Sequence, residues 1–170
     1  MKELTMTDNW NDAATSALES IWDFRTNCEE EGLTNIWVEM LRGHLDLFIE
    51  SNFEKNDNPA AMPVPTWWAI VATDAIFIAR DRGLEFTVES VQEVLVRKQQ
   101  DYGHENIRRF GLQGLLVRIH DKVARLENLV ANGGTPNNES IEDTLLDIVG
   151  YSAIGIMWEK GEFMLDLKPV

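Results

Sequence analysis

The chain of 170 residues suits one domain, or one domain with an appendage, and 44% hydrophobic residues allow a real core. Its net charge of −14 argues against general binding to a nucleic-acid backbone, which requires clustered Lys and Arg. The single cysteine, Cys28, excludes an internal disulfide framework, so we expect a cytoplasmic protein. The most apolar stretch (residues 67–79) is too short to span a bilayer, so we expect that the protein enters no membrane.

Helical periodicity dominates the first half of the chain. We expect a first amphipathic helix over residues 8–27, capped by Thr7 or Asp8, and a second over residues 34–53. Residues 54–65 contain three prolines and an Asn-rich start, which predicts a loop and the best candidate for a domain boundary.

Four further segments complete the predicted fold, an all-α helical bundle of about six helices. A third helix is expected over residues 66–82 and a fourth from Thr87 or Glu89, interrupted by residues 101–111. Residues 112–131 have the clearest helical pattern in the chain, and a turn over 132–138 precedes a last helix from Glu139 or Ser140 to about Lys160. This organisation predicts an N-terminal helical extension (1–60) that could form an interface, a core domain (66–160) and a C-terminal tail (161–170).

Positive charge is concentrated in the middle of this acidic chain. Seven of the fifteen basic residues lie within 97–125, against three acidic residues. On the predicted helix 112–131, Arg118, Asp121, Lys122 and Arg125 fall within about 100° of one another. This face is either a solvated surface with an i, i+4 ion pair or a phosphate-binding face, because guanidinium and ammonium groups suit phosphate oxygens.

The last predicted helix begins with four carboxylates, those of Glu139, Glu142, Asp143 and Asp147, and continues with apolar residues on both sides. Such a pattern indicates a buried central helix, in which a carboxylate is costly unless it is paired or binds a metal. Oxygen ligands of this kind suit Mg²⁺ or Mn²⁺. Glu139 and Glu142 could instead favour the helix dipole or act as caps.

The dipeptide His120-Asp121 offers a different metal hypothesis. Together with His104 and Asp147 it could mimic the ligand set of HD-type phosphohydrolases. The match is only two residues long, and on a helix His120 and Asp121 point about 100° apart.

The residues from the fourth predicted helix onward resemble a known family, the nucleotide-modification-associated helical domain, which is found largely in bacteriophages and their hosts. The resemblance covers about residues 90–158 and rests on the order and spacing of Lys98-x-x-Asp101-Tyr102-Gly103, Phe110-Gly111, Arg118-x-x-Asp121-Lys122-x-x-Arg125-Leu126 and Glu139-Ser140-Ile141-Glu142-Asp143-x-x-x-Asp147-x-x-x-Tyr151. It implies a role in nucleotide metabolism, in the host cytoplasm if the protein is phage-encoded. More distantly, the helices are similar to the MazG and dimeric dUTPase group of all-α pyrophosphohydrolases, which hold Mg²⁺ against a triphosphate and are oligomeric.

The leading hypothesis is therefore a metal-dependent nucleotide pyrophosphohydrolase, with Asp121, Asp143 and Asp147 as its catalytic residues. One or two Mg²⁺ (or Mn²⁺) ions would be held by Asp121, Glu139, Glu142, Asp143 and Asp147. Phosphates, base and sugar would be bound by Lys98, Asp101, Tyr102, Arg108, Arg109, Arg118, Lys122 and Arg125. The helix 112–131 contains no ExxE pair of the MazG type, and this departure motivates a non-catalytic alternative.

Two alternatives remain open at this point. The same site could bind or sequester a nucleotide or another phosphorylated small molecule without hydrolysing it. The first sixty residues contain thirteen acidic and four basic residues, so the chain could also be an acidic interaction module for a basic partner. Several tryptophans and the oligomeric relatives lead us to expect a homodimer or a higher oligomer.

Overall fold

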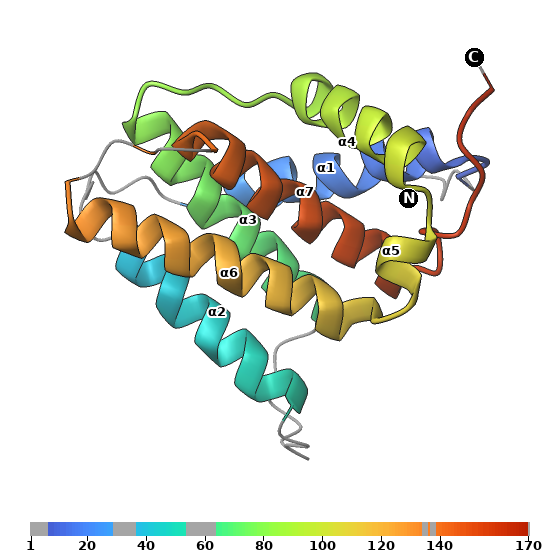
Figure 1. Cartoon of the computed structure of the whole chain (residues 1–170). Coiled ribbons are helices and arrows are strands. Elements are labelled where there is room, and N and C mark those ends of the chain that lie inside the picture. The colour runs from blue at the N-terminus through green and yellow to red at the C-terminus, as the bar shows by residue number, and fades with distance from the viewer. Residues whose placement is uncertain (1–6, 29–36, 54–63, 134–135, 137–138, 170) are drawn as a thin grey trace.

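The computed structural model describes residues 7–28, 37–53, 64–133, 136 and 139–169. Within these ranges it contains seven helices and no strand, which confirms the all-α prediction (Figure 1). The helices are α1 (Trp10–Thr26), α2 (Trp37–Phe53), α3 (Val64–Asp81), α4 (Val88–Tyr102), α5 (Glu105–Arg108), α6 (Gly111–Ala131) and α7 (Ile141–Glu159). The short α5 lies inside the segment 101–111 that was predicted as an interruption.

The helix starts follow local capping chemistry. The side chain of Asn9, rather than Thr7 or Asp8, accepts a hydrogen bond from the backbone of Asp12 and caps α1. At α4, Thr87, one of the two predicted helix starts, forms a reciprocal capping box with Ser90. The α3 helix begins two residues earlier than predicted, at Val64, because a proline in the first turn is compatible with a helix start.

The central helix of the bundle is α7, as its apolar sequence predicted. Twelve of its residues are buried, and it contacts α3 most extensively and α6, α1 and α4 as well. Figure 1 shows α7 running between α4 and α6. The close approach of α3 depends on Gly155, because a Cβ at this position would lie 2.4 Å from the ring of Trp68. None of the helices in the described part of the chain is long and apolar enough to cross a membrane.

The described parts of the predicted N-terminal extension and C-terminal tail belong to the same hydrophobic core as the rest. Trp10, Leu18 and Ile21 on α1 and Leu41 on α2 are fully buried in this core. The α1 helix packs against α3, α4 and α7, and α2 packs against α3 and α6. In the tail, Phe163 is buried, and the backbone N–H of Trp10 donates to the carbonyl of Asp166 at 2.7 Å. The use of residues 1–60 as an interface or an interaction module stays a prediction.

Candidate functional site

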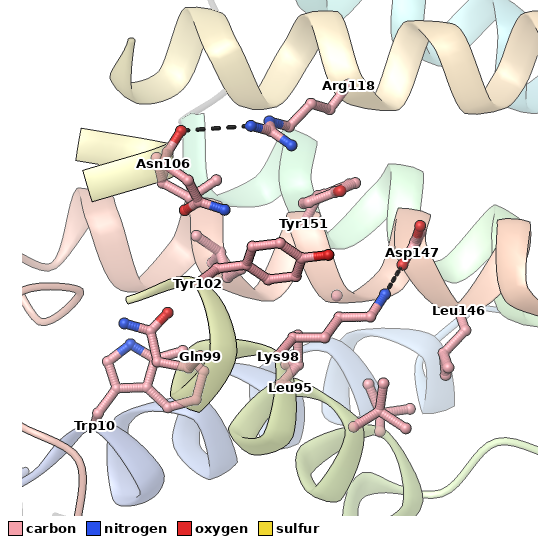
Figure 2. Close-up of a pocket in the computed structure, with 15 residues that line it drawn as sticks. Trp10, Leu95, Lys98, Gln99, Tyr102, Asn106, Arg118, Leu146, Asp147 and Tyr151 are labelled. Atoms are coloured by element: carbon pink, nitrogen blue, oxygen red, sulfur yellow. Dashed lines mark hydrogen bonds and ion pairs between the residues drawn. The ribbon is translucent and has the colours of Figure 1, made fainter. Parts of the chain in front are cut away.

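A cavity of about 330 Å³ lies where α4, α5, α6 and α7 meet, with the start of α1 at one end. This volume falls in the range of small-molecule sites in proteins. Much of the wall is aliphatic, and its polar or aromatic lining consists of Trp10, Lys98, Gln99, Tyr102, Asn106, Arg118, Asp147 and Tyr151 (Figure 2). Four of these, Lys98, Tyr102, Arg118 and Asp147, were predicted as site residues from the sequence. The structure brings them to one cavity, and their roles stay predictions.

Asp147 is the buried acidic group of the cavity and is paired with two lysines from different helices. The ammonium of Lys98 on α4 donates to one carboxylate oxygen, and Lys122 on α6 lies 2.8 Å from the other. Burial raises the pKa of Asp147, but the hydrogen bonds from Lys122 and Lys98 outweigh this effect and place the pKa below its ordinary value. The carboxylate is therefore ionised at neutral pH and serves as the internal counter-ion of both lysines.

A second layer of contacts fixes α6 against the start of α7. Lys122 also donates to both carboxylate oxygens of Glu139 at 2.7 Å. Burial lowers the pKa of Lys122, but its bonds to Asp147 and Glu139 raise the pKa above the ordinary value. Arg125 donates to the hydroxyl of Thr144 and to the backbone carbonyl of Glu139. Lys122, Arg125 and Glu139 thus support the wall of the cavity without lining it.

Arg118 on α6 is the cavity cation with the least neutralised charge. Its guanidinium donates to the backbone carbonyl of Asn106 at 3.4 Å and lies 5.8 Å from the ring centre of Tyr151. Both partners are neutral, and within the described ranges no carboxylate forms an ion pair with Arg118. The backbone carbonyl and the aromatic ring therefore hold the guanidinium in place while its charge stays available to an anionic ligand.

The other predicted site residues do not line the cavity. Asp101, Arg108, Arg109, Asp121, Glu142 and Asp143 are all exposed. Arg108 pairs with Glu105 at 3.0 Å, and the guanidinium of Arg109 lies 5.9 Å from the ring of Phe110. The structure does not bring these residues to the cavity wall, and their predicted roles in binding stay predictions.

Of the carboxylates predicted as metal ligands, Glu139 and Asp147 share the ammonium of Lys122, and the other three are exposed. Asp143 accepts hydrogen bonds from the hydroxyl and backbone of Ser140 in the capping box of α7, and Asp121 lies 3.9 Å from His120 on the helix surface. Each carboxylate oxygen of Asp147 is paired with a lysine ammonium. Among the described residues, no three or more His, Cys, Asp or Glu side chains are grouped so that they could hold a metal ion. A set of converging ligands for Mg²⁺ or Mn²⁺ is therefore not formed there.

Four polar or aromatic residues of the cavity wall were not predicted: Trp10, Gln99, Asn106 and Tyr151. Gln99 could have been found, because it continues the buried stripe of Val91 and Leu95 at four-residue spacing on α4. Tyr151 follows Asp147 by one helical turn and therefore shares its face of α7. Trp10 could not have been found, because only the packing of α1 against α4 and α7 brings it to the cavity.

Most of this site lies in a segment of the chain that matches a known protein family. Residues 98–158, a little over a third of the chain, match the family model described as "Nucleotide modification associated domain 1". The matching segment includes the end of α4 from Lys98, α5, α6 and nearly all of α7, and it contains all of the polar or aromatic cavity lining except Trp10. The match supports the resemblance expected from the sequence, while similarity to the MazG group stays a prediction. Neither the curated proteins nor the solved structures contain a match to this chain.

Proposed function

We propose that the protein binds a nucleotide in this cavity, with the phosphate near Lys98 and Arg118 and the base toward the inner, less polar end. The observation behind the proposal is the combination of cationic and aromatic side chains from four helices around one cavity of ligand size. Its location within the segment that matches a nucleotide-modification-associated domain supports the same reading.

Lys98 and Arg118 have the chemistry that a phosphate requires. The side chain of Lys98 is 46% exposed, so its ammonium can be reached by a ligand while it is paired with Asp147. Arg118 presents a planar set of N–H donors that suits phosphate oxygens. A phosphate that enters the cavity would compete with Asp147 for the ammonium of Lys98. In the free protein, the Asp147 carboxylate is therefore the counter-ion at the position that we propose for the phosphate.

The remainder of the lining suits a planar, partly apolar group such as a base. Tyr102 and Tyr151 contribute aromatic rings, and Leu95 and Ile154 contribute aliphatic surface. Tyr102 is 66% exposed, so its ring is free to cover a ligand at the mouth of the cavity. Aromatic rings of this kind stack on bases of any identity.

The test is a binding screen of the purified full chain against ribo- and deoxyribonucleoside mono-, di- and triphosphates, with and without Mg²⁺. Binding is measured by thermal unfolding and confirmed by calorimetry. We expect at least one nucleotide to raise the melting temperature, because a ligand that binds only the folded state stabilises it. A screen in which no nucleotide shifts the unfolding temperature or releases heat would refute the proposal.

Metal-dependent pyrophosphohydrolysis is the second candidate function. The resemblance noted above favours it, and Asp147 provides one carboxylate on the cavity wall. Of the remaining predicted ligands, Glu139 approaches Asp147 with the ammonium of Lys122 between them. Asp121, Glu142 and Asp143 are exposed, so this activity rests on the resemblance. Chromatography of the nucleotide after incubation with protein and Mg²⁺ decides between the two. Intact nucleotide favours binding alone, and formation of a monophosphate and pyrophosphate would establish the hydrolase.

A further inference from the structure

The inner end of the cavity contains two buried N–H groups without a partner. The amide nitrogen Nε2 of Gln99 and the indole nitrogen Nε1 of Trp10 are shielded from solvent and donate to no atom in the described part of the chain. Gln99 is only 5% exposed and Trp10 is fully buried, and both residues line the cavity. Figure 2 shows them together at one end, away from the Lys98–Asp147 pair at the other.

Unpartnered donors of this kind are rare in folded proteins, because a buried N–H that loses its bond to water destabilises the fold. The lining residues Val91, Leu95 and Ile107 are aliphatic, so their side chains offer no acceptor. Both donors therefore lack an acceptor, and a ligand in the cavity could supply one.

We infer that this end of the cavity recognises an oxo group on the nucleotide base. The inference rests on the proposed nucleotide binding and specifies which bases the site takes. A carbonyl oxygen has two lone pairs and can accept from both N–H groups at once. An exocyclic amino group in the same position offers only N–H donors and would leave the protein donors unpaired.

Trp10 is the more discriminating of the two residues. The amide of Gln99 can turn its own oxygen toward an amino group, whereas an indole N–H can only donate. A site built around buried donors rejects a ligand without the matching acceptor much more strongly than an apolar pocket rejects a small change in shape.

The experiment compares matched nucleotides that differ by one oxo or amino group. Inosine and adenosine monophosphates differ at C6, and uridine and cytidine monophosphates differ at C4. We expect the oxo member of a pair to bind the wild-type full chain about tenfold more tightly, as measured by calorimetry. Equal affinities within both pairs would overturn the inference while leaving nucleotide binding intact. If none of these or the other screened nucleotides bound, the proposed function itself would fail.

Two variants test the residues. Gln99→Leu removes the unpaired amide, so we expect the free protein to unfold at an equal or higher temperature and the oxo preference to fall at least threefold. Trp10→Phe, if it folds, should reduce the preference further. Gln100→Leu changes an exposed amide on the same helix and should leave the preference unchanged. A lower unfolding temperature for Gln99→Leu would show that the amide has a partner within the protein and would overturn the inference, as would an unchanged preference.

Discussion

The ammonium of Lys122 on α6 lies 2.8 Å from the carboxylate of Asp147 on α7. Lys98 on α4 donates to the other oxygen of the same carboxylate, so one acidic group joins three helices at the cavity. This arrangement identifies Asp147 as a counter-ion for lysines in the free protein. Its role as a metal ligand would require both lysines to be displaced.

Asp147→Asn should therefore strengthen the binding of phosphate-containing ligands, by a few-fold, because Lys98 would no longer be neutralised. The same change should lower the free energy of unfolding by about 1–2 kcal/mol, less than for a fully buried pair since Lys98 is half exposed. Calorimetry and urea unfolding measure the two effects. Glu93→Gln, which removes an exposed negative charge from α4, serves as the control. Loss of binding in Asp147→Asn would show that the carboxylate contacts the ligand or a metal.

The pH dependence of this pair follows from the lowered pKa of Asp147. A carboxylate whose pKa is lowered on folding stabilises the protein above its ordinary pKa of 3.8, and this contribution is lost as the pH falls through the folded value. The stability difference between wild type and Asp147→Asn should thus be constant near neutral pH and disappear in strong acid. A difference that persisted there would show that lost packing, and not lost charge, destabilises the variant.

Asp143 should prove to be a capping residue. Its carboxylate accepts from Ser140 in the capping box of α7, so Asp143→Ala should lower the free energy of unfolding by about 1 kcal/mol. We expect nucleotide affinity, measured with and without Mg²⁺, to stay within twofold of wild type. Loss of a Mg²⁺-dependent part of the affinity would instead support the metal role predicted from the sequence.

Gly155 should be essential for the packing of α7 on α3. An added Cβ would meet the ring of Trp68 at 2.4 Å, so Gly155→Ala should destabilise the protein by roughly 1–3 kcal/mol or more. Gly43→Ala is the matched control, because nothing lies within 4 Å of a Cβ on that exposed position of α2. The control should stabilise the protein by up to about 1 kcal/mol through higher helix propensity. Equal effects of the two changes in chemical unfolding would contradict the described helix packing.

His44 on α2 should make stability depend on pH near neutrality. Its Nδ1 lies 2.7 Å from the buried carboxylate of Asp74 on α3, and this hydrogen bond raises the pKa of His44 above 6.5. The stabilisation is fully present below pH 6.5 and is lost as the pH rises through the folded pKa. Urea unfolding over this range should show wild type losing stability while His44→Gln does not. Parallel curves for the two proteins would refute the pair.

The helical fold could be predicted from the sequence because each long helix has its own periodicity and cap. Thr87 and Ser140 gave the starts of α4 and α7 by local chemistry alone. The four-residue α5 was missed, since a single turn is too short to show periodicity. The burial of α7 was evident from apolar residues on both of its faces.

The site was only partly predictable. Arg118 and Asp147 stood out because charge on a patterned or buried helix needs a partner, and Lys98 stood out through the basic segment and the family resemblance. Sequence spacing could not show that Lys122 and Arg125 bond to Glu139 and do not line the cavity, since this depends on how α6 crosses the start of α7. It also could not separate the capping role of Asp143 from a metal role, because both favour a carboxylate in the first helical turn.

The most direct test of nucleotide binding in the cavity is calorimetry on a pair of variants that change net charge equally. Arg118→Gln removes the cavity guanidinium, and Arg97→Gln removes an exposed one on α4 that does not line the cavity. With the nucleotide that binds wild type best, Arg118→Gln should weaken binding at least tenfold, since a charge-assisted hydrogen bond to phosphate is lost. Arg97→Gln should stay within about twofold of wild type, because only screened long-range attraction changes. Equal affinities of Arg118→Gln and wild type would contradict the placement of the nucleotide in this cavity.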